Sequence, residues 1–237
     1  MSDMIDYYEE VLLLRKKVEK YETLLTGVNE MTTFDFGNGL VPAHQHPNGG
    51  GWVADTATVS ETAYVGPDAM VYDNAKVSDN AEVYDNARVS GDAEVSGDAM
   101  VSGDVRVYDN ARVFDDAVVS GNAEVSGNAE VSGNALVYRN ALVYGNAEVY
   151  DNARVSGDAL VSGYAEVYDN AWVSGHAVVS GYARVDDNVR VSGNAVVTDN
   201  AVVTGNVRVY GYARVSDNVR VYGNAWVSGH AWVTGNE

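Results

Sequence analysis

Apolar and polar positions alternate along most of this chain in a unit of six residues. Valine occupies position 53 and every sixth position after it as far as 233, which makes 31 consecutive hexapeptides without insertion or deletion. Around each valine, inward and outward positions alternate with the two-residue period of a short strand that has one buried face. The Gly/Asp–Asn pair that follows tolerates positive φ, so we predict a corner after each strand.

This unit, for example VSGNAE at 125–130, resembles the repeat of the hexapeptide-repeat proteins, in which a small residue stands four positions after an aliphatic one. The match covers residues 53–236. The resemblance implies an all-β solenoid, a left-handed parallel β-helix of triangular section with three hexapeptides per turn and about ten turns over residues 52–237. The stretch GGGWVADTATV at 49–59 is similar to the entry into the coils of phage- and prophage-encoded members.

The inward positions hold valine and alanine, and at four of them valine replaces alanine: Val105, Val189, Val207 and Val219. Such a core is narrow and apolar, with no room for a ligand. We therefore expect any function to lie on the outer faces, at the corners, at the ends or between subunits.

Taking every eighteenth residue sorts the outer positions into three faces. One face carries a charged ladder from Thr58 to Arg184, which we interpret as solvated. The other two carry an apolar stripe along the edge where they meet, formed by Met100, Val118, Leu136, Leu142, Leu160, Val178 and Val196. A row of this length is too large to stay in contact with water, so we predict that it forms the interface of a homotrimer, the assembly that the resemblance implies.

Residues 1–30 follow a different pattern, with apolar side chains in steps of three and four. They form the seam of a heptad repeat: Met4, Tyr7, Val11, Leu14, Val18, Tyr21, Leu25 and Val28. Opposite charges at the flanking positions, such as Glu10 with Arg15, favour a parallel, in-register arrangement. We predict a parallel trimeric coiled coil, and the alternative is an amphipathic helix folded back on its own chain.

Residues 31–51 form a junction that contains Gly, Pro and His and that we expect to be irregular. His44 and His46 stand two residues apart, so on an extended strand their rings point to the same side. Three copies on a threefold axis supply six imidazoles, enough for an octahedral transition-metal site. The pair is similar to the His-x-His metal sites of trimeric phage fibres, and the alternative is a polar junction without metal. We expect no other cofactor.

The amino-acid composition narrows the range of possible binding partners. Lys and Arg number 15 against 34 Asp and Glu, a formal charge of −19, which disfavours nucleic acid and anionic membranes as partners. The absence of cysteine excludes disulfides and thiolate metal sites. We see no signal peptide and no membrane span, and we expect a virion-associated protein or one in the host cytoplasm.

The segment AWVSGHA occurs at 171–177 and again at 225–231, and it carries His176 and His230. The two histidines are three turns apart on one corner, about 14 Å from each other. The simplest interpretation is that these bulky residues fill space between subunits. The aromatic end nevertheless suggests a ligand-binding tip, whose candidate residues are Trp226, His230, Trp232, Tyr212 and Tyr222.

We therefore expect a non-enzymatic trimeric structural or binding protein, a phage-associated fibre or adhesin-like shaft with a glycan or another cell-surface or virion partner. The alternative is a hexapeptide-repeat acyltransferase, because the resemblance implies that relatives bind an acyl-CoA donor between subunits and use a histidine as general base. His176 is the positional match for that base. Against the enzyme, the repeats lack the projecting loop that shapes the acceptor pocket in such relatives, and no acidic partner for His176 is evident.

Overall fold

The computed structural model describes residues 15–18 and 32–235, and the chain divides into two compact units, residues 1–33 and 34–237. In the first unit, residues 15–18 are helical. The coiled coil predicted over residues 1–30 lies outside the described residues apart from this short helix. It therefore stays a prediction.

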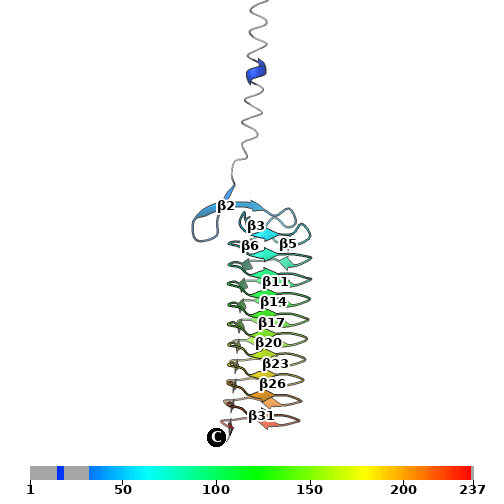
Figure 1. The fold of residues 1–237 in the computed structure, drawn as a ribbon, viewed down its shortest axis with the longest axis vertical. Helices are drawn as coiled ribbons and strands as arrows, with labels where there is room; N and C mark the ends of the chain where they lie inside the picture. The colour runs from blue at the N-terminus through cyan, green and yellow to red at the C-terminus, as the bar shows by residue number, and fades with distance from the viewer. Residues whose placement is uncertain (1–14, 19–31, 236–237) are drawn as a thin grey trace, which may run out of the picture. The chain divides into compact units, whose positions relative to one another are not determined.

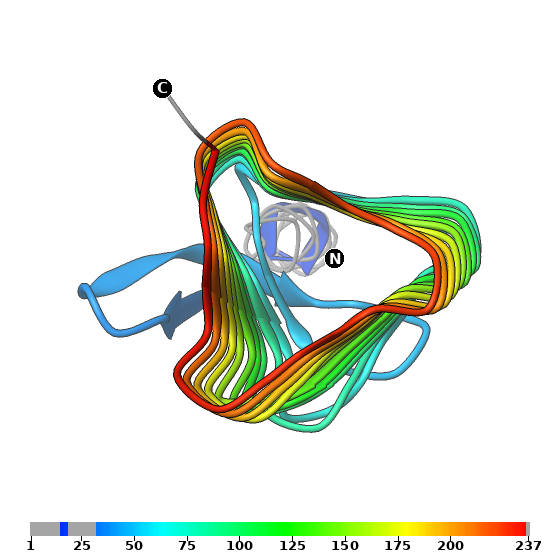
Figure 2. The ribbon, with the colours of Figure 1, turned by 90° about the horizontal axis from the view of Figure 1, so that it is seen from below.

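The second unit is a solenoid of short strands whose turns stack along one axis (Figure 1). Each strand pairs in parallel with the strand three places further along the chain, 18 residues away; Glu94, for example, is the register partner of Arg112. The coils superimpose on a triangular section with one sheet on each side (Figure 2). The predicted all-β parallel solenoid with 18-residue turns is thus confirmed, whereas its left-handed coiling stays a prediction.

We name each face after its first parallel strand. The β3 face contains β3 (Trp52–Ala54), β6 (Met70–Val71), β9 (Arg88–Val89), β12 (Arg106–Val107), β15 (Glu124–Val125), β18 (Leu142–Val143), β21 (Leu160–Val161), β24 (Val178–Val179), β27 (Val196–Val197), β30 (Arg214–Val215) and β33 (Trp232–Val233). The β4 face contains β4 (Thr58–Val59), β7 (Lys76–Val77), β10 (Glu94–Val95), β13 (Arg112–Val113), β16 (Glu130–Val131), β19 (Glu148–Val149), β22 (Glu166–Val167), β25 (Arg184–Val185), β28 (Val202–Val203) and β31 (Arg220–Val221). The β5 face contains β5 (Tyr64–Val65), β8 (Glu82–Val83), β11 (Met100–Gly103), β14 (Val118–Gly121), β17 (Leu136–Arg139), β20 (Arg154–Gly157), β23 (Trp172–Val173), β26 (Arg190–Val191), β29 (Arg208–Val209) and β32 (Trp226–Val227).

The core consists of the inward valine and alanine side chains, which are almost fully buried from Ala63 to Val215. Three of the four valines that replace alanine, at 105, 189 and 207, are fully buried, and Val219 packs against the core in the last turn. Close packing of these small side chains leaves the outer surface as the place for any chemistry.

The corners are held by polar side chains as well as by backbone shape. Asp79 has a φ of 58°, and its carboxylate accepts a hydrogen bond from the N–H of Gly97, one turn further on, at 3.1 Å. The asparagine that follows such a position continues a second ladder, in which the Asn140 amide donates to the Asp158 carboxylate at 2.9 Å. The Gly/Asp–Asn pair therefore both turns the chain and joins successive turns.

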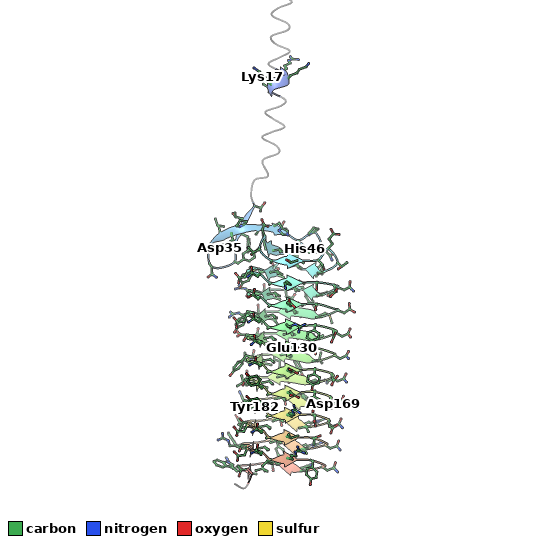
Figure 3. All side chains as sticks on the ribbon, viewed as in Figure 1. Lys17, Asp35, His46, Glu130, Asp169 and Tyr182 are labelled. Atoms are coloured by element: carbon green, nitrogen blue, oxygen red, sulfur yellow. The ribbon has the colours of Figure 1, made fainter. Side chains whose placement is uncertain are left out.

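The charged ladder lies on the β4 face, as predicted, and Glu130 marks it in Figure 3. The Lys76 ammonium donates to the Glu94 carboxylate at 2.8 Å, and the Arg112 guanidinium donates to Glu130 at 2.9 Å. The hydrogen bond from Lys76 lowers the pKa of Glu94. Because these pairs are exposed, they contribute little to stability.

Part of the junction is regular rather than irregular. Strands β1 (Thr33–Asp35) and β2 (Leu40–Gln45) extend the β3 face, and β2 pairs antiparallel with β3. Phe34 stacks on Trp52 with ring centroids 4.4 Å apart, and Phe36 packs edge-on against Phe34 at 4.9 Å. These strands cover the first edge of the β3 face, which is otherwise open to pairing with other chains.

Candidate functional site

The first AWVSGHA segment packs against the turns on both sides of it. The Trp172 indole N–H donates to the Ser156 hydroxyl at 3.1 Å, and the Arg190 guanidinium carbon lies 5.6 Å from the centre of the Trp172 ring. At the following corner, His176 Nδ1 lies 3.5 Å from a carboxylate oxygen of Asp158. This acidic partner was not predicted from the sequence, although it stands 18 residues before His176, the length of one turn.

The second segment lies at the C-terminal end and has different neighbours. The His230 ring stacks on Tyr212, with centroids 5.1 Å apart and planes 6° apart. The Trp226 and Trp232 side chains, on the β5 and β3 faces, are 65% and 71% exposed. The two segments therefore share a sequence and a corner but differ in surroundings: a carboxylate beside His176, an aromatic ring beside His230.

The predicted ligand residues are spread over the last two turns. Tyr212 and His230 lie at the corner between the β5 and β3 faces, where Trp226 and Trp232 flank them. Tyr222 follows β31 on the β4 face and is 74% exposed. Four of the five candidates thus gather around one corner, and Tyr222 stands apart from them.

The apolar stripe forms two ladders on adjoining faces, as the 18-residue spacing predicts. On the β5 face the register partners are Met100, Val118 and Leu136, and on the β3 face they are Leu142, Leu160, Val178 and Val196. Met100 and Leu142 are the most exposed members, at 36% and 37%. Both ladders flank the corner that carries His176, and their contact with other subunits stays a prediction.

The two junction histidines do not share a solvent-exposed face. His46 lies beyond the end of β2, is buried, and its Nε2 lies 3.0 Å from the Ala63 carbonyl oxygen (Figure 3). His44 is exposed, and its Nδ1 lies 2.9 Å from a carboxylate oxygen of Asp55. Among residues 15–18 and 32–235, no cluster of three or more His, Asp or Glu side chains has the geometry of a metal site. The metal site on a threefold axis therefore stays a prediction, without the shared face on which it was based.

The two largest of four hollows among the described residues lie elsewhere on the solenoid. One, of about 480 Å³, is lined at the N-terminal end by Phe36, Pro42 and Tyr72, among others. The other, of about 420 Å³, lies beside Tyr164 and Tyr182, whose rings stack 4.9 Å apart at a corner of the β4 face. Neither lining contains a histidine, so neither supports general-base chemistry by His176 or His230.

Glu148, which lines the second hollow, and two tyrosines that follow strands of the β4 face have pKa values above their ordinary range. Burial, together with the neighbouring Glu166 carboxylate, raises the pKa of Glu148. Burial also raises the pKa of Tyr150 to about 12, and Tyr150 stacks on Tyr168 at 4.9 Å. The Tyr168 hydroxyl donates to Asp186 at 2.7 Å, which adds to the effect of burial in raising its pKa. Both hydroxyls therefore stay protonated at neutral pH, and that of Tyr168 acts as a hydrogen-bond donor rather than as a base.

A family model described as the YdcK β-solenoid repeat matches the chain in five segments, residues 105–121, 129–145, 147–163, 189–205 and 213–229. The segments begin at inward positions and cover almost one 18-residue turn each. The chain is a β-solenoid repeat protein. A search of curated proteins found no match to it. Among the described residues of this β-solenoid, no helix has the length and hydropathy that crossing a membrane requires.

Proposed function

We propose that this β-solenoid repeat protein is a non-enzymatic, homotrimeric structural and binding protein. In this proposal residues 1–30 form a parallel coiled coil, the left-handed solenoid is a rigid shaft, and its C-terminal end binds a glycan. A phage-associated fibre or adhesin-like protein, on the virion or in the host cytoplasm, is the biology that fits best.

The observation that carries the proposal is the gathering of exposed aromatic side chains on the last turns. Tyr210, Tyr212, Tyr222, Trp226 and Trp232 are 38% to 74% exposed and lie within the last two turns, whereas the exposed tyrosines of the shaft before them, Tyr144, Tyr164 and Tyr182, are spread over more than two turns. Aromatic rings with one apolar face and a polar rim suit the faces of sugars. Exposed aromatic groups in such number mark an interaction surface.

A glycan array tests this directly. Wild-type protein should bind at least one glycan, and Trp232→Ala should lose that binding while sedimentation still shows the assembled protein. Tyr182→Ala is the matched control, because this ring is 60% exposed but stands almost three 18-residue turns before Trp232. If no glycan binds, or if Tyr182→Ala removes binding and Trp232→Ala does not, the tip is not the binding site.

The trimer is supported by the two apolar ladders and by the heptad seam, which place apolar rows in both units of the chain. The ladders stop before the tip, because the register partner of Leu136 is Arg154 and that of Val196 is Arg214. The last turns therefore lack the aliphatic rows that we propose to hold the subunits together, although they lie on the same two faces as the ladders.

The second candidate is an acyltransferase with an acyl-CoA donor, and one observation favours it. Asp158, 3.5 Å from His176, supplies the orienting carboxylate that a general base needs. Both side chains are more than half exposed, so the pair lies in high-dielectric surroundings. Acetyl transfer from acetyl-CoA to a panel of amines and sugars, lost in His176→Ala and retained in His230→Ala, would establish the enzyme. If the wild-type protein transfers no acetyl group to any acceptor of the panel, the acyltransferase proposal is contradicted and the binding-protein proposal stands.

A further inference from the structure

The acidic charge of the chain is confined to part of its length. Residues 184–237 contain five arginines and five Asp or Glu, so residues 1–183 carry the whole formal charge of −19. The C-terminal turns are therefore the region where an anion meets the least repulsion from the protein.

Within the described part of these turns, the carboxylate side chains lie on the β4 face or at its two corners, and the β3 and β5 faces have none. Asp186 lies on the β4 face, and Asp187, Asp199 and Asp217 lie at the two corners that border it. From Trp172 to residue 235, the β5 face, the β3 face and the corner between them carry no carboxylate side chain. The charged side chains that remain there are arginines, at 190 and 208 on the β5 face and at 214 on the β3 face.

Two successive turns place these arginines over tryptophans. The segment RVYGYAR at 208–214 lies directly above WVSGHAW at 226–232, and we call the two together the C-terminal band. The Arg208 guanidinium carbon lies 5.2 Å from the centre of the Trp226 ring, and that of Arg214 lies 5.6 Å from Trp232. The Tyr212–His230 stack at the corner lies between these two pairs. The band is thus a row of three pairs, two cation–π pairs on either side of one aromatic stack.

The guanidinium groups of the band have no anionic partner among the described residues. The salt bridges of residues 15–18 and 32–235 include Arg112 and Arg184, each 2.9 Å from a glutamate, but neither Arg208 nor Arg214. Arg208 is moreover the register partner of Arg190, so two like charges stand on adjacent strands. The indole ring attracts a guanidinium group placed over it, and it accepts no conventional hydrogen bond, so the guanidinium N–H groups stay free to donate to an anion.

We infer that the C-terminal band binds an anionic glycan, whose carboxylate or sulfate groups pair with Arg208 and Arg214 while its sugar rings lie on Trp226 and Trp232. This inference rests on the proposed glycan-binding function and adds that the glycan is negatively charged. A short anionic glycan is favoured over a nucleic acid, because a long polyanion would extend from the band onto the acidic shaft.

The test compares a charged probe with its neutral counterpart. Trigalacturonate is titrated into the full-length protein by calorimetry, in parallel with its trimethyl ester, a sulfated trisaccharide and the oligonucleotide (dT)12. The double variant Arg208→Gln/Arg214→Gln removes the two cations. The matched control is Arg88→Gln/Arg106→Gln, because these two arginines are also exposed, one on each of two adjacent strands of the β3 face.

A charged trisaccharide, carboxylated or sulfated, should bind to wild type and to the control, and the neutral ester at least about tenfold more weakly. The Arg208/Arg214 variant should lose at least about tenfold in affinity for the charged probe, and added salt should weaken binding by wild type. If every variant binds the ester and the acid equally well, the proposal that the ligand is anionic is wrong, whereas the proposal that the tip binds a glycan still stands. Binding of (dT)12 alone would replace the glycan by a nucleic acid, and binding of none of the four probes would end both proposals.

Discussion

Replacing Gly103 by alanine tests whether the corners carry the stability of the solenoid. Gly103 has a φ of 86°, and a Cβ atom built on it lies 2.5 Å from the carbonyl oxygen of Gly121 on the next turn. That oxygen accepts the N–H of Asp104 at 2.7 Å, so the turns cannot separate without weakening this hydrogen bond.

The magnitude follows from three contributions. An alanine in the left-handed backbone conformation costs about 1–2 kcal/mol. Pushing the neighbouring turn away from the new Cβ atom costs about 1–3 kcal/mol, and weakening the hydrogen bond from Asp104 to Gly121 costs up to about 1 kcal/mol. We expect Gly103→Ala to lower the local free energy of unfolding by about 3–5 kcal/mol. Because a solenoid is coupled mainly between neighbouring turns, the loss should be concentrated around residues 85–121.

Hydrogen exchange followed by mass spectrometry measures this local stability, and thermal unfolding reports the whole shaft. The matched control is Arg139→Ala, at the same corner two turns further on, where a Cβ atom is already accommodated at a φ of 66°. That variant should change stability by less than about 0.5 kcal/mol. If the two variants exchange alike around their corners, the close approach at Gly103 does not limit stability and the reasoning fails.

Three further predictions concern the assembly, the pH response and the metal. Leu142→Asp together with Leu160→Asp should convert a trimer into monomers in sedimentation, because charges would be buried without partners. Glu148→Gln should raise the melting temperature at pH 7, because the folded state raises the pKa of Glu148 above 4.5 and so disfavours its charged form; the difference should close as the pH falls below 4.5. Protein purified without a histidine tag should contain transition metal that His44→Ala/His46→Ala removes, measured by elemental analysis.

Each of these three predictions has a control variant or an outcome that would contradict it. Val118→Thr, a milder change on the β5 ladder, should leave the trimer assembled, and a wild type that is monomeric at micromolar concentration excludes the interface. Glu94→Gln should have the opposite effect to Glu148→Gln at pH 7, because Lys76 lowers the pKa of Glu94 and its charged form stabilises the fold. Less than about 0.1 metal per trimer, with no change in melting on chelation, rules out the metal site.

Several site features follow from the length of the turn rather than from any local motif. Asp158 beside His176, and Arg208 and Arg214 over the tryptophans, are all pairs separated by 18 residues. The sequence analysis used this spacing to sort apolar and charged rows but not to pair cations with aromatic rings. Applied to every outer position, the same spacing would have found these pairs.

The junction shows where sequence patterns were insufficient. The Pro and Gly residues of 31–51 indicated an irregular segment, yet Leu40–Gln45 forms a strand because it pairs with the first edge of the β3 face. That pairing, and the burial of His46 against the Ala63 carbonyl group, depend on contacts with residues that follow the junction. No periodicity inside the junction encodes them.

The repeating part of the molecule was predictable from the order of its residues alone: the inward valines, the corners, the assignment of outer residues to faces and the two apolar ladders. This is so because each hexapeptide forms the same strand and corner, and stacking repeats one local geometry. The features that interrupt this repetition became visible in the folded molecule alone: the capping strands β1 and β2 and the burial of His46 against the Ala63 carbonyl group. They depend on which side chains meet at the end of the solenoid, where a residue's neighbours no longer follow from its own hexapeptide or from the 18-residue turn.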